Sequence, residues 1–210
     1  LLDATAGPDL GDPYWAPPPK RPFIEEVGAD PGSLRIAFTT KTADQTTQVH
    51  PDCVQAVREA AALCEDLGHR VEETDFTRKA DYHAIGRDFM VLYCGQLAAT
   101  IQTICSALGH EPGPGMFEPV TWMLYEMGKA FTAADYLIAT TNLQKLSRTV
   151  AALFTAYDLT LTPTLSQPPL PLNGLLPAGE DPRRSWARVA SFAAFTPLEN
   201  ITGQPAMSVP

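Results

Sequence analysis

Three consecutive segments decide the fold: LRIAF at 34–38, HPDCVQAVREAAALCEDLG at 50–68 and HRVEE at 69–73. The first alternates toward a buried strand. The second has apolar residues at helical spacing, with Pro51 in a first-turn position and Gly68 as a terminator. The third begins another strand. A strand, a helix and a strand within about 40 residues form a βαβ unit, whose crossover is almost always right-handed.

The remaining pattern continues this alternation. Residues 82–108 have a helical pattern interrupted by Gly86 and Gly95, so two helices or one kinked helix are expected. Shorter helices are predicted at 117–129 and 186–195, and a long one from 132 to about 156. The long helix starts with TAAD at 132–135, which resembles a capping box with Asp as the weaker partner at its last position. A short strand is predicted at 159–163, where its proline ends it. We therefore expect an α/β fold: a mixed β-sheet flanked by helices on both faces. Strands 34–39, 70–75 and 159–163 should share one sheet.

Composition excludes several function classes. The 210 residues carry nine more acidic than basic side chains, and the isoelectric point is near 4.8, so nucleic-acid binding through a basic face is not expected. No uninterrupted apolar run approaches the roughly 20 residues of a membrane helix, so no membrane partner is expected. The four cysteines form no C-x-x-C pair and the four histidines are scattered, which predicts free thiols, no metal and a cytoplasmic location.

Proline is over-represented, with 20 residues, and it is concentrated at the amino end and between 166 and 182. Residues 1–32 should form an extended strap on a surface, because proline removes donors and fixes φ. PPPKRP at 17–22 could also bind an aromatic groove as a polyproline helix. The chain starts without Met and closes at SVP (208–210) inside an apolar strand, so we expect a piece of a longer chain, cut at both ends.

No complete catalytic motif is visible. The chain has no G-x-S-x-G turn, no adjacent glycines and no phosphate-binding G-x-x-x-x-G-K-[ST]. Cys94 is the one thiol beside a flexible residue, Gly95, and it shares its helix with Phe89 and Tyr93. It is interpreted as a core cysteine or as part of a pocket wall, since no nearby base would activate the thiol.

Three segments resemble the amidase signature family. LENITGQPAMSVP at 198–210 is similar to the family's N-x-T-G-x-P-A-x-S-x-P segment, and YDLTLTPT at 157–164 is similar to its D-x-x-x-x-P-T strand. GPDLGDP at 7–13 resembles the G-x-D-x-x-D turn that follows the catalytic core. Within the family, Cys94 and residues 121–127 most resemble the branch that hydrolyses 6-aminohexanoate cyclic dimers. The resemblance covers essentially the whole chain.

This resemblance implies part of an α/β/α sandwich and an amide hydrolase with a Ser–cis-Ser–Lys triad and no metal or cofactor. In the family the triad and its Gly-Ser-rich loop precede the G-x-D turn, and no such stretch occurs here. No catalytic residue is therefore assigned, and the isolated chain is expected to be inactive. Residues 1–32 are interpreted as the strap after the catalytic core, and 33–210 as the C-terminal part of a single amidase domain, truncated at both ends.

The resemblance also suggests where substrate would bind. Candidate pocket positions are Cys94, Trp122, Thr162, Pro163 and Thr164, although Trp122 could equally be a core aromatic. Asn200 and Gly203 are expected to act in a turn. The implied partners are a small-molecule amide and the missing N-terminal part of the protein, and a homodimer is left open. Two alternatives stand: a non-catalytic α/β interaction module that binds through its proline segments, and a hydrolase that uses Cys94 as nucleophile.

Overall fold

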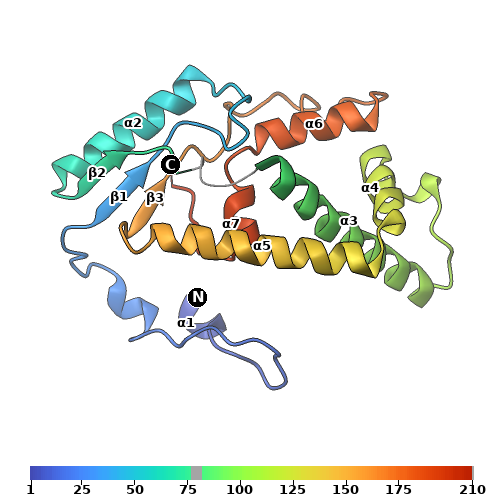
Figure 1. Cartoon of the computed structure of the whole chain (residues 1–210), viewed down its shortest axis with the longest axis horizontal. Coiled ribbons are helices and arrows are strands. Elements are labelled where there is room, and N and C mark those ends of the chain that lie inside the picture. Colours follow the sequence, from blue (N-terminus) through green and yellow to red (C-terminus); the bar gives the residue numbers. More distant parts are fainter. Residues whose placement is uncertain (77–81, 210) are drawn as a thin grey trace.

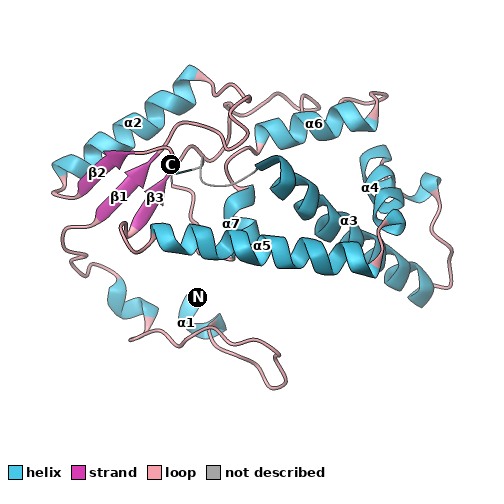
Figure 2. Ribbon diagram, in the orientation of Figure 1, coloured by secondary structure: helices cyan, strands magenta, loops and turns pink. Residues whose placement is uncertain are grey.

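The structure is a computed structural model, and it describes residues 1–76 and 82–209 (Figures 1 and 2). Strands β1 (Arg35–Phe38), β2 (Arg70–Glu73) and β3 (Leu159–Leu161) form one sheet in the order β2-β1-β3. Both pairings are parallel, with Ile36 opposite Val71 on one side and Leu159 on the other. The predicted α/β class and the shared sheet are confirmed. The described strands are all parallel, so the antiparallel members of a mixed sheet are not among them.

Helix α2 (Pro51–Asp66) is the crossover of the βαβ unit. His50 caps it by accepting a hydrogen bond from the Asp52 amide at 3.2 Å, and Pro51 occupies the first turn as predicted. Val57 and Ala61 are buried, and the helix packs against β2. Gly68 has φ +92° just after the helix, which is the left-handed conformation that glycine adopts without strain.

Three further helices extend away from the sheet (Figure 1): α3 (Tyr82–Ala107), α4 (Pro119–Ala130) and α5 (Ala133–Leu153). A short 3₁₀ turn, η3 (Pro114–Met116), precedes α4. Helix α3 packs on both α4 and α5, and it runs through Gly86 and Gly95 as a single helix. The capping box predicted at the start of α5 is confirmed, with the Thr132 and Asp135 side chains each bonding the other's backbone amide.

The contact between α3 and α4 depends on Gly128. A Cβ placed on this residue would overlap the backbone carbonyl of Cys94 and come within 2.9 Å of the Ala98 Cβ. Gly95, the flexible residue beside Cys94, has only the Tyr136 ring at 3.9 Å. The glycine that lets the helices approach is therefore on α4 rather than on α3.

The carboxyl-terminal region differs in detail from the prediction. Helix α6 (Pro182–Phe192) ends earlier than expected, and a second short helix, α7 (Pro197–Thr202), follows it. The strand predicted around Ser208 is absent from the described residues, since 204–209 have no strand assignment and Val209 is 63% exposed. A strand needs a neighbour to pair with, and no described segment offers one there.

Residues 1–32, the amino-terminal arm, contain a short helix α1 (Leu2–Thr5) and a 3₁₀ turn η1 (Phe23–Glu26). The carboxylate of Asp3 accepts hydrogen bonds from the amides of Phe23 and Ile24, at 2.6 and 2.8 Å. These bonds join the two ends of the arm. Almost every residue of the arm is exposed, and Figure 1 shows it running alone below α5. The arm is therefore extended as expected, but it does not lie on a surface of the described remainder of the chain.

One helix segment among the described residues, Ile85–Ala107, is long and apolar enough to cross a membrane by length and composition alone. Such a segment is also found in core helices that pack inside a protein. Its solvent side carries Gln96, Thr100 and Thr103, while Cys94 and Ile101 are buried against neighbouring helices. Tyr93 and Ile104 are also exposed, at 43% and 54%, so the helix buries only one of its sides in the described part of the chain.

The Gly128 contact predicts opposite effects for two glycine substitutions. Gly128→Ala should lower the free energy of unfolding by about 1–3 kcal/mol, because the added methyl group forces α4 away from α3. Gly95→Ala is the matched control and should leave stability unchanged or raise it by up to about 1 kcal/mol, since alanine favours helix. Urea denaturation followed by circular dichroism measures both, and equal stability of the two variants would contradict the assigned contact.

Candidate substrate pocket

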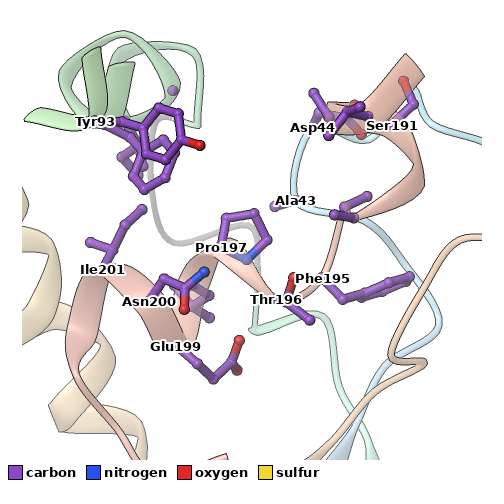
Figure 3. A pocket seen from close by; sticks show the side chains of 18 of the residues that line it. Ala43, Asp44, Tyr93, Ser191, Phe195, Thr196, Pro197, Glu199, Asn200 and Ile201 are labelled. Atoms are coloured by element: carbon purple, nitrogen blue, oxygen red, sulfur yellow. The ribbon is translucent and has the colours of Figure 1, made fainter. Parts of the chain in front are cut away.

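A cavity of about 570 Å³ lies where α3, α6 and α7 meet the loop after β1. Figure 3 shows Tyr93 and Ile201 on one side of it, Ala43, Asp44 and Ser191 on the other, and Pro197 between them. The lining is mainly apolar and includes five aromatic residues: Phe76, Phe89, Tyr93, Trp186 and Phe195. A concave, largely apolar site with a few polar groups is the usual form of a small-molecule pocket.

Three stacked aromatic rings form one wall of the cavity. Phe89 and Tyr93 are one helical turn apart on α3, with ring centres separated by 5.7 Å. Tyr93 also stacks on Trp186 of α6 at 5.7 Å, so the wall joins two helices that are distant in sequence. Offset stacking of this kind adds about 0.5–1.5 kcal/mol per pair beyond the burial of the rings. The rings therefore hold the wall in place as well as line it.

The position of α6 is fixed by an ion pair. Both carboxylate oxygens of Glu180 accept hydrogen bonds from Arg188, at 2.7 and 2.6 Å, and a third bond comes from the Ser185 hydroxyl. The Arg188 hydrogen bonds, followed by that of Ser185, lower the pKa of Glu180 to about 2. Arg188 also donates to the Leu175 carbonyl, which ties the proline-rich connection to the helix. This network orients the helix that carries Trp186.

Asp44 locks the loop at the other side of the cavity. Its carboxylate accepts hydrogen bonds from the Thr42 hydroxyl at 2.7 Å, the Thr47 hydroxyl at 2.6 Å, and the amides of Thr46 and Thr47. Burial raises the pKa of Asp44, but the hydrogen bonds, from Thr47 first, outweigh it and hold the pKa below its ordinary value. The carboxylate therefore acts as an acceptor that shapes the loop.

Helix α7 contributes the residues at the centre of the pocket. Pro197 starts the helix, and Gly203 ends it with φ +70°, so the expected turn role of Gly203 is confirmed. Glu199 and Asn200, which lie within this helix, line the cavity. Burial raises the pKa of Glu199, with a smaller opposing effect from a backbone hydrogen bond. A half-buried carboxylate on an apolar wall is thus one polar feature that a ligand would meet.

The structure brings two of the predicted motifs together. Thr162 lines the cavity, and Pro163 is buried directly after β3. Thr164 is exposed, and its hydroxyl lies 3.0 Å from that of Ser208, so the turn after β3 is joined to the carboxyl-terminal segment. The predicted turn at 162–164 and α7 therefore border the same pocket.

Cys94 and Trp122 lie elsewhere, in the packing between α3 and α4. Cys94 is fully buried, and burial raises the pKa of its thiol, the opposite of what activates a nucleophile. Trp122 packs beside Phe117 and Tyr125, with ring centres 6.4 and 5.0 Å away. Neither residue is among the described residues that line the cavity. A pocket role for either residue in a larger enzyme stays a prediction.

Asp44, Trp186 and Phe195 are pocket residues that the sequence reasoning missed. Trp186 did carry a signal, because Val189 and Ala190 follow at helical spacing and make one apolar face. Asp44 had no comparable signal, since its acceptor role depends on the path of a six-residue loop. Among the residues that the structure describes, no three His, Cys, Asp or Glu side chains are grouped so that they could hold a metal ion.

Comparison with known proteins establishes the family. The sequence profile of the Amidase family matches residues 1–210. The chain belongs to the amidase family. It is 29% identical over its whole length to a putative amidase of Synechocystis, of which it covers 38%. It is 26% identical, again over its whole length, to the 6-aminohexanoate-cyclic-dimer hydrolase of Paenarthrobacter ureafaciens, of which it covers 44%.

Solved structures agree with this assignment. A structure of 6-aminohexanoate cyclic dimer hydrolase superposes with a TM-score of 0.82 at 25% identity, over 97% of this chain and 43% of that one. The same enzyme in complex with substrate gives a TM-score of 0.84 at 23% identity. The fold is therefore that of amidase signature enzymes, and the chain spans less than half the length of these relatives.

Asp44 provides a test of the loop at the pocket. Asp44→Asn should lower the free energy of unfolding at pH 7 by about 1–3 kcal/mol, because the amide cannot accept all four hydrogen bonds. Since the folded-state pKa is lowered, the stabilisation is present above the ordinary pKa of aspartate and is lost as the pH falls below it. Thermal unfolding of the parent and variant from pH 7 to pH 2 measures this difference.

The control is Glu111→Gln, which removes an exposed carboxylate from the loop after α3. This control should follow the parent at every pH. A gap between Asp44→Asn and the parent that stays constant down to pH 2 would contradict the charged, hydrogen-bonded state of Asp44.

Proposed function

We propose that this chain forms the substrate-pocket part of an amidase that hydrolyses a carboxylic amide C–N bond with a Ser–Ser–Lys triad located upstream of these residues. Membership of the amidase family over all 210 residues is the observation that carries the proposal. The apolar cavity supports it, because Thr162 and α7 border the cavity and both belong to segments that resemble the family's motifs.

In this proposal the chemistry belongs to the upstream part. There the lysine, acting through the middle serine, accepts the proton of the second serine, whose Oγ bonds to the amide carbonyl carbon. The C–N bond breaks as the amine leaves with a proton, and water then releases the acid from the acyl-enzyme. This chain's residues would bind and orient the substrate and exclude water around it.

The pocket favours an amide with an apolar acyl group. The stacked wall of Phe89, Tyr93 and Trp186 suits an aliphatic or aromatic chain. The name of the Paenarthrobacter relative points to an aliphatic amide, 6-aminohexanoate cyclic dimer, as a first substrate to examine. We further propose a cytoplasmic enzyme that needs no cofactor, a location with which the four free cysteines are compatible.

The two alternative functions fare differently. A hydrolase with Cys94 as nucleophile is disfavoured, because the thiol is fully buried and burial raises its pKa. One observation supports a non-catalytic interaction module: the PPPKRP segment at 17–22 is exposed and therefore accessible to a binding partner. A binding module has no need of an apolar cavity this large, however, so the amidase proposal accounts for more of the structure.

The first test is turnover. The 210-residue chain alone should show no hydrolysis of aryl amides or of 6-aminohexanoate cyclic dimer, because loss of a catalytic triad typically removes about 10⁶ of the rate. The longest product of the reading frame that encodes the chain should be active and insensitive to chelators. Activity of the repurified 210-residue chain would contradict the proposed division, and inactivity of the longest product on all amides would contradict the function.

Cys94 gives a second test, in the longest active product. Cys94→Ala should change the relative kcat/KM among acyl chain lengths by tens-fold at most, since a non-covalent pocket contact contributes about 1–3 kcal/mol. Complete loss of activity with the fold intact would make Cys94 catalytic. Unchanged selectivity would leave it as the core residue seen between α3 and α4. Cys105→Ala is the matched control, because this residue is also a buried cysteine of α3.

A further inference from the structure

Tyr93 combines a fixed aromatic ring with an unused hydroxyl group. The ring stacks on Phe89 at 5.7 Å between ring centres, with 18° between the ring planes, and on Trp186 at 5.7 Å with 25°. A ring that stacks on two neighbours from different helices has little freedom to turn away. The position of the hydroxyl at its far end is therefore set by α3 and α6 together, before any ligand arrives.

The hydroxyl of Tyr93 is directed into the cavity. Figure 3 shows it pointing away from α3, toward the side of the cavity where Ala43 and Asp44 lie. In residues 1–76 and 82–209 it has no hydrogen-bond partner. The Tyr157 hydroxyl, by contrast, donates to Glu72 at 2.8 Å. A fixed hydroxyl that the fold does not use is available to a ligand.

Tyr93 also borders a second cavity, which explains why a stacked residue is 43% exposed. This cavity of about 430 Å³ lies between α3, α5 and α7. Both cavities are lined by Phe89, Tyr93, Asn200 and Ile201, so these side chains form the wall between them. The Tyr93 ring thus stands at a junction, and a ligand can reach its hydroxyl without displacing packed protein.

The charges around the larger cavity restrict which ligand group this hydroxyl can meet. The described lining residues include two carboxylates, Asp44 and Glu199, and no Lys, Arg or His. Asp44 already accepts four hydrogen bonds, and these lower its pKa, so it stays charged at neutral pH. A second negative charge in the same cavity is repelled. A neutral acceptor is therefore favoured over a carboxylate.

We propose that Tyr93 is a specificity-determining residue, which donates a hydrogen bond to a neutral carbonyl oxygen in the acyl part of the substrate. The preferred substrate is then an amide whose acyl chain carries a second, uncharged carbonyl group. A phenol is suited to this role, because its O–H is a donor and a carbonyl oxygen offers two lone pairs. The proposal rests on the proposed function and names the substrate class of its pocket.

Binding of two small ligands tests the hydrogen bond directly. Acetophenone carries a carbonyl group where ethylbenzene has a methylene, and neither contains an amide. Ligand-detected NMR gives both dissociation constants for the longest product of the reading frame and for its Tyr93→Phe variant, which keeps the ring. The variant should lose about 3- to 10-fold of the preference for acetophenone, the net value of one hydrogen bond. An equal preference in both proteins overturns the proposal.

The matched control is Tyr157→Phe, which also removes one hydroxyl but does so beside the sheet, where it bonds Glu72. This variant should keep the preference of the parent for acetophenone. Thermal unfolding supplies a second readout, because Tyr93→Phe should leave the melting temperature of the longest product unchanged. A fall of several degrees would show that the Tyr93 hydroxyl bonds another part of the protein, and the proposal would fail.

Turnover tests the substrate class. The substrates are para-nitroanilides of heptanoic acid and of the three heptanoic acids with a ketone at the fourth, fifth or sixth carbon. At least one keto substrate should have a higher kcat/KM than the plain one. That ratio should fall about 3- to 10-fold in Tyr93→Phe. The mono-anilide of adipic acid, which carries a carboxylate, should be the poorest substrate. Faster turnover of this anion than of every keto substrate contradicts the neutral class.

The outcomes separate this proposal from the proposed function. Loss of the acetophenone preference in Tyr93→Phe, in a product that hydrolyses no amide, supports the role of Tyr93 and contradicts the function. Amide hydrolysis whose keto preference does not depend on Tyr93 supports the function and contradicts the role of Tyr93.

Discussion

The contact between Arg35 and Asp158 joins two parts of the chain that are 123 residues apart. The Asp158 carboxylate accepts from the Arg35 amide at 2.8 Å and from the guanidinium at 2.8 and 3.2 Å. The Asp158 amide in turn donates to the Arg35 carbonyl at 2.7 Å. The Arg35 side-chain bonds, first among the causes, lower the pKa of Asp158 to about 2. This exchange sets the register in which β3 enters the sheet beside β1.

The pocket depends on that register. Once β3 is aligned with β1, Thr162 and Pro163 follow at the carboxyl end of the sheet, which is where ligands usually bind in open parallel α/β sheets. The loop locked by Asp44 leaves β1 at the same end, and the segment that follows α7 reaches the turn after β3 through the Thr164–Ser208 contact. The Arg35–Asp158 contact, together with the β1–β3 pairing, therefore helps to bring residues from three distant segments to one end of the sheet. Asp158 is also the first residue of the D-x-x-x-x-P-T motif, and its bonds to Arg35 give a structural role to the aspartate of that motif.

The sequence predicted what local patterns determine. The βαβ unit, the cap at Thr132 and the end of α2 at Gly68 follow from periodicity and backbone preferences over a few residues. Long-range packing was harder to predict from the sequence. Gly95 and Gly128 look alike in sequence, and only the approach of α4 to Cys94 shows which of them is required. Helix α7 was missed because six residues hold too little periodicity, although Pro197 at its first position was a usable signal.

The arrangement of the helices bears on how binding and chemistry are divided. The aromatic wall is carried by α3 and α6, which are fixed by packing at Gly128 and by the Glu180–Arg188 pair. A wall held this firmly can select a ligand by shape at little entropic cost, because its side chains are already ordered. Under the proposed function, substitutions in this wall would change which amide is bound, whereas the attacking groups, proposed to lie upstream of these residues, would keep their own geometry. Substrate preference could then change while the reaction stays the same.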